Sequence, residues 1–231
     1  MKKDANGSGM IWNTPFSQFV RAEATVGKTW IWGRNSGQSI ATRFVVGAGH
    51  AYGNSNALPF EKHFYAGGAN SLRGWQARTV GPGTSARDTS FVIPNQTGDM
   101  RLEANVEYRF DIVWKLEGAV FADAGNVWTL KQKDVAVEDG SMFRWNTLGE
   151  SIAANWGLGL RLDFGFLLLR VDMGMKIHDP ARVQKWVTPD MWLKRDGFAV
   201  HFGVGYPSCR GFGCDHHRFP GTSFSRCPQA C

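Results

Sequence analysis

Cysteine is absent from the first 208 residues of this 231-residue chain, and all four cysteines fall in the last 23 residues. Long apolar runs are also missing, because no stretch approaches the roughly 18 residues of a membrane-spanning helix. The opening residues, MKKDANGSGMIW, contain two lysines but lack the apolar segment of a signal peptide. These absences exclude a transmembrane helix, and we expect any export signal to lie outside the chain.

A strong excess of charge of one sign is lacking too. The net charge is +6, but the arginines alternate with apolar residues or stand beside acids, so we expect no nucleic-acid partner. What the chain does contain is 28 glycines, 10 tryptophans and 16 phenylalanines. This composition is typical of many strands with aromatic ends and not of a helical bundle.

Alternation of apolar and polar residues is the clearest pattern. In MRLEANVEYRF (100–110) every second residue is apolar or small, and the other five are charged or amide side chains. Such a period of two predicts a strand with one apolar face and one strongly polar face. The same pattern predicts six more strands, at 16–32, 38–52, 114–128, 156–165, 167–177 and 197–206.

The connections between these strands alternate between short and long. Short turns at one end and long loops at the other are the organisation of a transmembrane β-barrel. A soluble antiparallel sandwich also alternates, but long strands and unequal loops are then unexplained. Seven strands cannot close as an antiparallel cylinder, so we expect the C-terminal part of a larger barrel.

The long connection at 53–97 contains FYAGGANSLRGWQARTVGPG (64–83), which is too rich in glycine for a helix interior and too irregular for a strand. Loops of this length are usually functional or disordered. If the loop folds back into the barrel, Arg73 meets acids on the polar faces of the strands. These acids are Glu103, Glu107, Glu117, Asp123, Asp163 and Asp172.

The stretch FYAGGANSLRGW (64–75) resembles the loop motif of the BamA/TamA-type outer-membrane assembly factors, in which [VI]RG[FY] follows F-x-x-GG-x-x-S. Three further stretches are similar to strand motifs of that family, in the same order: VFADAGNVW (120–128), GLGLRLDFG (157–165) and GFAVHFGVGYP (197–207). The resemblance covers about residues 14–207. Leu72 and Trp75 replace the usual Val/Ile and Phe/Tyr but keep the apolar character.

The resemblance implies an all-β fold, an antiparallel transmembrane β-barrel of about 16 strands in the outer membrane of a Gram-negative bacterium. This chain would supply about seven C-terminal strands and a long loop that enters the lumen. The loop motif is Leu72, Arg73, Gly74 and Trp75. The resemblance also implies that the lumen acids paired with Arg73 are Asp123 and Asp163, and bidentate carboxylates suit a confined guanidinium.

By resemblance, the chain belongs to a factor that assembles, inserts or translocates other outer-membrane proteins, and strand pairing at a barrel seam is a plausible mechanism. The seam strand would be 197–206, and its candidate residues are Phe198, Phe202, Gly203, Gly205 and Tyr206. Expected partners are outer-membrane lipids, unfolded β-barrel or surface-protein clients, and periplasmic or inner-membrane assembly partners. We expect no cofactor and no bound metal.

One other function is open at this point, and two more are disfavoured. A passive outer-membrane channel or a two-partner secretion pore fits the same barrel. A phosphate-binding reading of GGANSLRG is poor because no helix follows it. We expect no enzyme activity, since His50, His63, His178 and His201 stand in no recognisable catalytic arrangement.

The chain is therefore expected to have three parts. Residues 1–13 are a disordered or truncated start, 14–207 belong to the barrel, and 208–231 are a Cys-rich tail outside it. The tail spacing, C-x4-C-x12-C-x3-C, lacks the C-x2-C pair of a strong zinc site. Disulfides are possible in an oxidising periplasm, but our preferred interpretation is that the tail is not native to the barrel.

Overall fold

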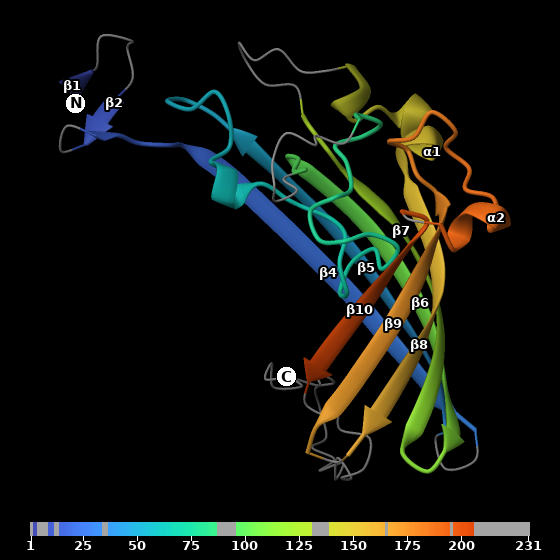
Figure 1. Cartoon of the computed structure of the whole chain (residues 1–231). Coiled ribbons are helices and arrows are strands. Elements are labelled where there is room, and N and C mark those ends of the chain that lie inside the picture. The colour runs from blue at the N-terminus through green and yellow to red at the C-terminus, as the bar shows by residue number, and fades with distance from the viewer. Residues whose placement is uncertain are drawn as a thin grey trace.

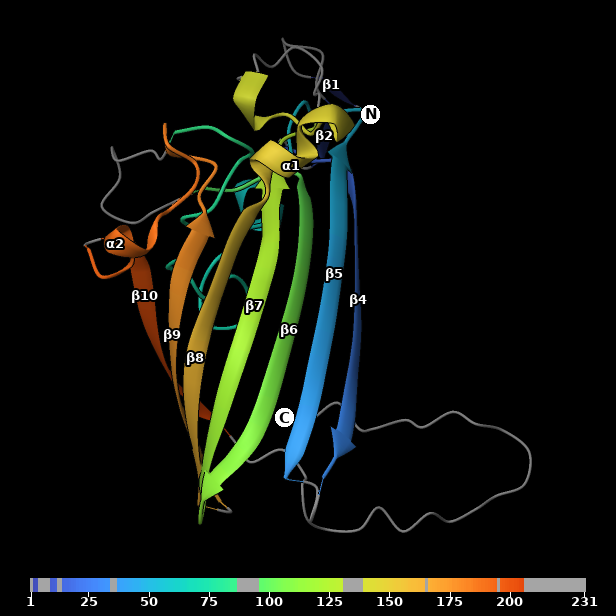
Figure 2. The same cartoon turned by 90° about the vertical axis from the view of Figure 1, so that its right-hand side faces the viewer.

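The chain was analysed as a computed structural model, which describes residues 2–3, 9–11, 14–33, 37–86, 96–130, 139–164, 166–194 and 196–205. Seven long strands form one antiparallel sheet in which neighbours in sequence are neighbours in space (Figures 1 and 2). They are β4 (Phe19–Trp32), β5 (Gln38–Ala51), β6 (Met100–Val113), β7 (Leu116–Trp128), β8 (Ala153–Asp163), β9 (Leu168–His178) and β10 (Phe198–Gly205). The predicted number and order of strands are confirmed.

The remaining elements are short. Three strands near the start, β1 (Lys2–Lys3), β2 (Gly9–Ile11) and β3 (Thr14–Pro15), pair in a small separate sheet. The long connections contain the 3-10 turns η2 (Phe60–Lys62), η3 (Asp139–Ser141) and η4 (Trp145–Thr147), and the single-turn helices α1 (Leu148–Ser151) and α2 (Pro189–Trp192). Within the described ranges, no helix has both the length and the apolar character needed to cross a membrane.

The two faces of the sheet have inverted polarity compared with a soluble protein. On β6 the side chains of Glu103, Asn105 and Glu107 are buried, whereas Val106 between them is 48% exposed. On β8 Leu158 is 46% exposed and Arg161 only 3%. A strand that turns apolar residues outward and polar residues inward is suited to lipid outside and a polar lumen inside. A soluble sandwich would place these leucines and valines in its core.

The sheet is a curved wall with its turns and loops sorted to opposite ends (Figure 1). Short turns join β4 to β5, β6 to β7 and β8 to β9, while the described parts of the long connections 52–99, 129–152 and 179–197 lie at the other end. The described residues of the first long connection, 52–86 and 96–99, do not project away from the wall. They fold back over the concave face, as predicted for a loop that enters the lumen.

Both edges of the sheet lack a neighbouring strand among the described residues, with β4 at one edge and β10 at the other. Because the sheet has seven antiparallel strands, β4 and β10 run in the same direction and cannot close it by antiparallel pairing. In lipid, unpaired backbone groups at such edges are very unfavourable. The sheet therefore requires further strands to form a barrel. Tyr206 and the tail at 208–231 lie outside the described residues.

The inverted polarity predicts opposite tolerance on the two faces. In the full-length protein, Leu158→Arg puts a charge on the outer face midway along β8, and we expect it to destabilise the folded barrel by about 2–4 kcal/mol. Thr25→Arg, midway along β4 and opposite Val45 on the concave face, is the matched control and should have little effect. Denaturant titration in lipid vesicles measures both variants. Equal, small effects would favour a soluble sheet.

Candidate functional site

The described part of the 52–99 connection, called the lumen loop from here on, is compact because it has an apolar core of its own. Phe64 exchanges two backbone hydrogen bonds with Gly98, at 2.8 and 2.9 Å, which closes the base of the loop. Above this base, apolar side chains of the loop pack with residues at the ends of β7 and β8. The cluster consists of Phe64, Ala66, Leu72, Trp75, Val80, Val127 and Ala153, all at most 2% exposed. Leu72 and Trp75 thus hold the motif in place from both sides of Arg73.

Arg73 is the charged centre of the site and is only 5% exposed. Its Nε and Nη2 donate to the two carboxylate oxygens of Asp123, at 3.0 and 2.8 Å, and Nη1 donates to Glu107 at 2.5 Å. The backbone N–H of Arg73 also donates to Asp123, at 3.2 Å. The guanidinium lies over the ring of Phe121, 3.4 Å from its centroid. Each nitrogen of the guanidinium therefore has a carboxylate partner on β6 or β7, and one of its faces lies on a ring of β7.

The electrostatics keep Arg73 charged in this buried position. Burial by itself lowers the pKa of the guanidinium, because it disfavours the charged form. The hydrogen bonds and negative charge of Asp123 and Glu107 outweigh that effect and raise the pKa of Arg73 above its ordinary value. A lysine in this position has a single point charge and could not reproduce the bidentate contact.

A row of side chains across four strands prepares Asp123 for this contact. In register, Arg43 of β5 lies opposite Asn105 of β6, then Asp123 of β7, then Asn155 of β8. Asn105 and Asn155 each donate an amide hydrogen bond to Asp123, at 2.9 and 3.0 Å. Asp123 is 2% exposed and receives donors from both sides as well as from above. The strands themselves thus supply two of the donors that orient Asp123 for the contact with Arg73.

Glycines allow the loop to approach the wall this closely. A Cβ on Gly74 would lie 2.7 Å from the Cβ of Asn155, and a Cβ on Gly174 of β9 would collide with the carbonyl of Arg73. The Arg-Gly sequence of the motif and the D-M-G-M stretch of β9 therefore have a shared physical reason. Both positions require the absence of a side chain.

The prediction that Asp163 is the second partner of Arg73 requires correction. The structure brings Arg73 to Asp123, as expected, but its second carboxylate is Glu107. Asp163 lies at the far end of β8, where its N–H donates to Lys115 at the short turn. It is eight residues beyond Asn155, the residue opposite Asp123, which corresponds to about 26 Å along a strand. The period-two pattern predicted the correct face of β8 for Asp163 but not its height, meaning its position along the strand direction.

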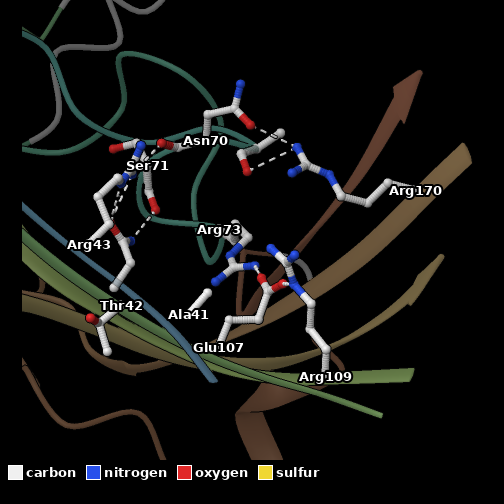
Figure 3. A pocket seen from close by; sticks show the side chains of 11 residues that line it. Ala41, Thr42, Arg43, Asn70, Ser71, Arg73, Glu107, Arg109 and Arg170 are labelled. Atoms are coloured by element: carbon white, nitrogen blue, oxygen red, sulfur yellow. Dashed lines mark hydrogen bonds and ion pairs between the residues drawn. The ribbon is translucent and has the colours of Figure 1, made fainter. Parts of the chain in front are cut away.

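Further arginines surround this centre (Figure 3). Glu107 also pairs with Arg109 and Arg161, at 2.5 and 2.9 Å, so three guanidinium groups share one carboxylate. Residues 69–75 form the tip of the lumen loop. Beside this tip is a cavity of about 170 Å³, and its lining includes Arg43, Arg109 and Arg170. Arg170 donates to Asn70 of the tip at 2.8 Å. The tip is therefore held by polar contacts on several sides.

Two contacts were missed by the sequence analysis. His201 of β10 approaches the carbonyl of Arg73, with Nε2 at 3.1 Å from the oxygen. Lys176 of β9 places its Nζ 5.2 Å from the centroid of the Trp75 ring and pairs with Asp179 and Asp196 at the base of the 179–197 loop. The polar parity of β9 and β10 could have indicated both residues. Their height relative to the loop could not be read from the sequence.

Four of the five candidate seam residues are described, and all four lie on the edge strand β10. Phe202 is 78% exposed and Phe198 37%, both on the outer face of β10. Gly203 and Gly205 face the lumen on the half of β10 nearer the short turns. Tyr206, the last of the predicted set, lies outside the described residues.

The Omp85 superfamily domain matches residues 11–207, which include the whole sheet and the lumen loop. The chain belongs to the Omp85 superfamily. Membership of this family places it in the outer membrane of Gram-negative bacteria, in agreement with the polarity of its strands.

This chain spans only part of the length of the longer proteins that it resembles. It is 28% identical over 125 residues to the outer membrane protein assembly factor BamA of Neisseria meningitidis serogroup B (strain ATCC BAA-335 / MC58), a match that covers 52% of this chain and 15% of that protein. The crystal structure of BamA from Haemophilus ducreyi lacking POTRA domains 1-3 superposes with a TM-score of 0.55 at 18% identity, covering 81% of this chain and 34% of that one. CdiB from Acinetobacter baumannii gives a TM-score of 0.44 at 14% identity, covering 81% and 27%.

The geometry predicts that the shape of the Arg73 contact matters as well as its charge. Arg73→Met leaves Asp123 buried beside neutral amides, and we expect a loss of roughly 3–5 kcal/mol in the stability of loop docking. Arg73→Lys should lose a large part of the same energy. Adding Asp123→Asn to Arg73→Met should cost less than the sum of the single changes. Limited proteolysis of the loop in the folded protein measures docking; strictly additive effects would contradict a direct pair.

Proposed function

We propose that this Omp85 chain is the loop-bearing side of a barrel that assembles other proteins into the outer membrane or translocates them across it. The observation that carries the proposal is the docked loop. A motif that resembles that of the assembly factors is held in the lumen by the ion pairs of Arg73 with Asp123 and Glu107, and the chain belongs to the Omp85 superfamily. The name of the Neisseria relative, an assembly factor, supports the same function.

We further propose that clients are engaged by strand pairing at β10. This strand lies at an edge of the described sheet. An edge strand presents unpaired N–H and C=O groups that another strand can complete. Gly203 and Gly205 weaken side-chain packing and permit bending on one half of the strand. In lipid, such an edge is favourable only when a strand of the same barrel or of a client covers it.

A passive channel is the alternative function. The loop tip argues against a wide open pore, because Arg73 and its neighbours fix it across the lumen face of five strands, β6–β10. The two functions make different demands on the Arg73 contact. A channel would gain conductance when the loop is released, whereas an assembly factor would lose activity.

A charge exchange in the full-length protein tests the proposed function. Arg73→Glu faces two carboxylates, so we expect client insertion in proteoliposomes to fall at least about tenfold, which corresponds to ~1.4 kcal/mol. Adding Asp123→Arg restores an opposite-charge pair and should recover part of the activity. The readout is folding of a denatured barrel client into the vesicles, with ion conductance recorded in parallel. Steady conductance with no client insertion by the unaltered protein would overturn the assembly proposal.

A further inference from the structure

His201 connects the edge strand to the tip of the lumen loop. It lies midway along β10, is 9% exposed, and has Nε2 at 3.1 Å from the carbonyl oxygen of Arg73. A carbonyl oxygen can only accept, so Nε2 is the donor and carries the proton. Among the described residues of β10, His201 is the only one with a side-chain hydrogen bond to the loop.

The carbonyl of Arg73 lies in a small recess made by the last hairpin. Gly174 of β9, opposite Ala199 of β10, forms the floor, because any side chain there would collide with this carbonyl. The other groups of Arg73 bind Glu107 on β6 and Asp123 on β7. A single loop residue therefore joins the middle of the sheet to its edge strand.

His201 separates two halves of β10 that differ in the side chains at their lumen positions. On the long-loop side, Ala199 and His201 are buried at 5% and 9% exposure. On the short-turn side, the lumen positions are Gly203 and Gly205, which have no side chain for the loop to hold. Nothing lies within 4 Å of a Cβ built on Gly205. This half pairs with β9, and the side chain that lies over Gly203 is that of Arg170 on β9.

We propose that His201 is a positioning residue that couples the lumen loop to the edge strand. The part of β10 at Gly203 and Gly205 can separate from β9 without disturbing the loop, whereas separation at His201 must break the hydrogen bond to Arg73. This inference rests on the proposed strand pairing at β10. Since the hydrogen bond joins the two elements, loosening either one must loosen the other by the same free energy. Movement of β10 past His201 would release the loop tip.

Amide hydrogen exchange of the full-length protein in lipid nanodiscs tests the coupling without a client. His201→Leu removes the donor, and we expect about fivefold faster exchange in both 198–201 and 69–75, the change expected from one hydrogen bond. His201→Gln keeps an N–H donor and should restore slow exchange in both segments. Val204→Ala, on the outer face of the same strand, is the matched control and should leave 69–75 unchanged.

A second pair of variants reaches the same contact from the other side. Gly174→Ala fills the recess without altering His201, and Arg73→Met undocks the tip, so each should accelerate exchange in 198–201. If 69–75 exchanges at the unaltered rate in His201→Leu, and 198–201 does so in Gly174→Ala and Arg73→Met, the coupling is wrong. If exchange changes in these variants as expected but His201→Leu inserts clients at the unaltered rate, the coupling stands and the use of β10 for strand pairing is contradicted.

Discussion

A buried guanidinium fixes this side of the barrel. A charge taken out of water is tolerated only when its partners are complete, and Arg73 has two carboxylates, an aromatic ring and a backbone contact around it. The amide row on either side of Asp123 and the glycines under the loop follow from that requirement. The amides donate hydrogen bonds to Asp123, and the glycines leave the space that the loop needs to bring Arg73 to the wall. The loop apolar cluster then sets the height at which Arg73 meets the wall.

The inverted sheet explains why the loop is held by polar chemistry. The apolar side chains of the strands face lipid, so the lumen face offers the loop mostly amides, carboxylates and guanidinium groups. Apolar burial is left to the loop itself and to the strand ends at Val127 and Ala153. The hydrophobic effect makes the loop compact but has no direction, whereas the ion pairs of Arg73 specify where the compact loop sits.

The sequence predicted the faces of the strands well and their relative heights poorly. Period-two alternation in 100–110 assigned Glu103 and Glu107 to the lumen, and the structure agrees. Height depends on register, which is set by turn geometry and by packing across strands, and a single sequence does not show it. Asp163 was therefore placed beside Arg73 although it lies near the short turn, and Glu107 was recognised only as one acid among six. His201 was missed for the same reason, since its partner is a backbone carbonyl in a distant loop.

The two acids that bind Arg73 differ in what they would keep if the loop left. Glu107 would still pair with Arg109 and Arg161, whereas Asp123 has no other ion-pair partner within the described part of the chain. Of the two acids, Asp123 is therefore the one that loses its described ion pair entirely, and it would keep only the amides of Asn105 and Asn155. Because amides donate but carry no charge, they lower the penalty of this loss without removing it.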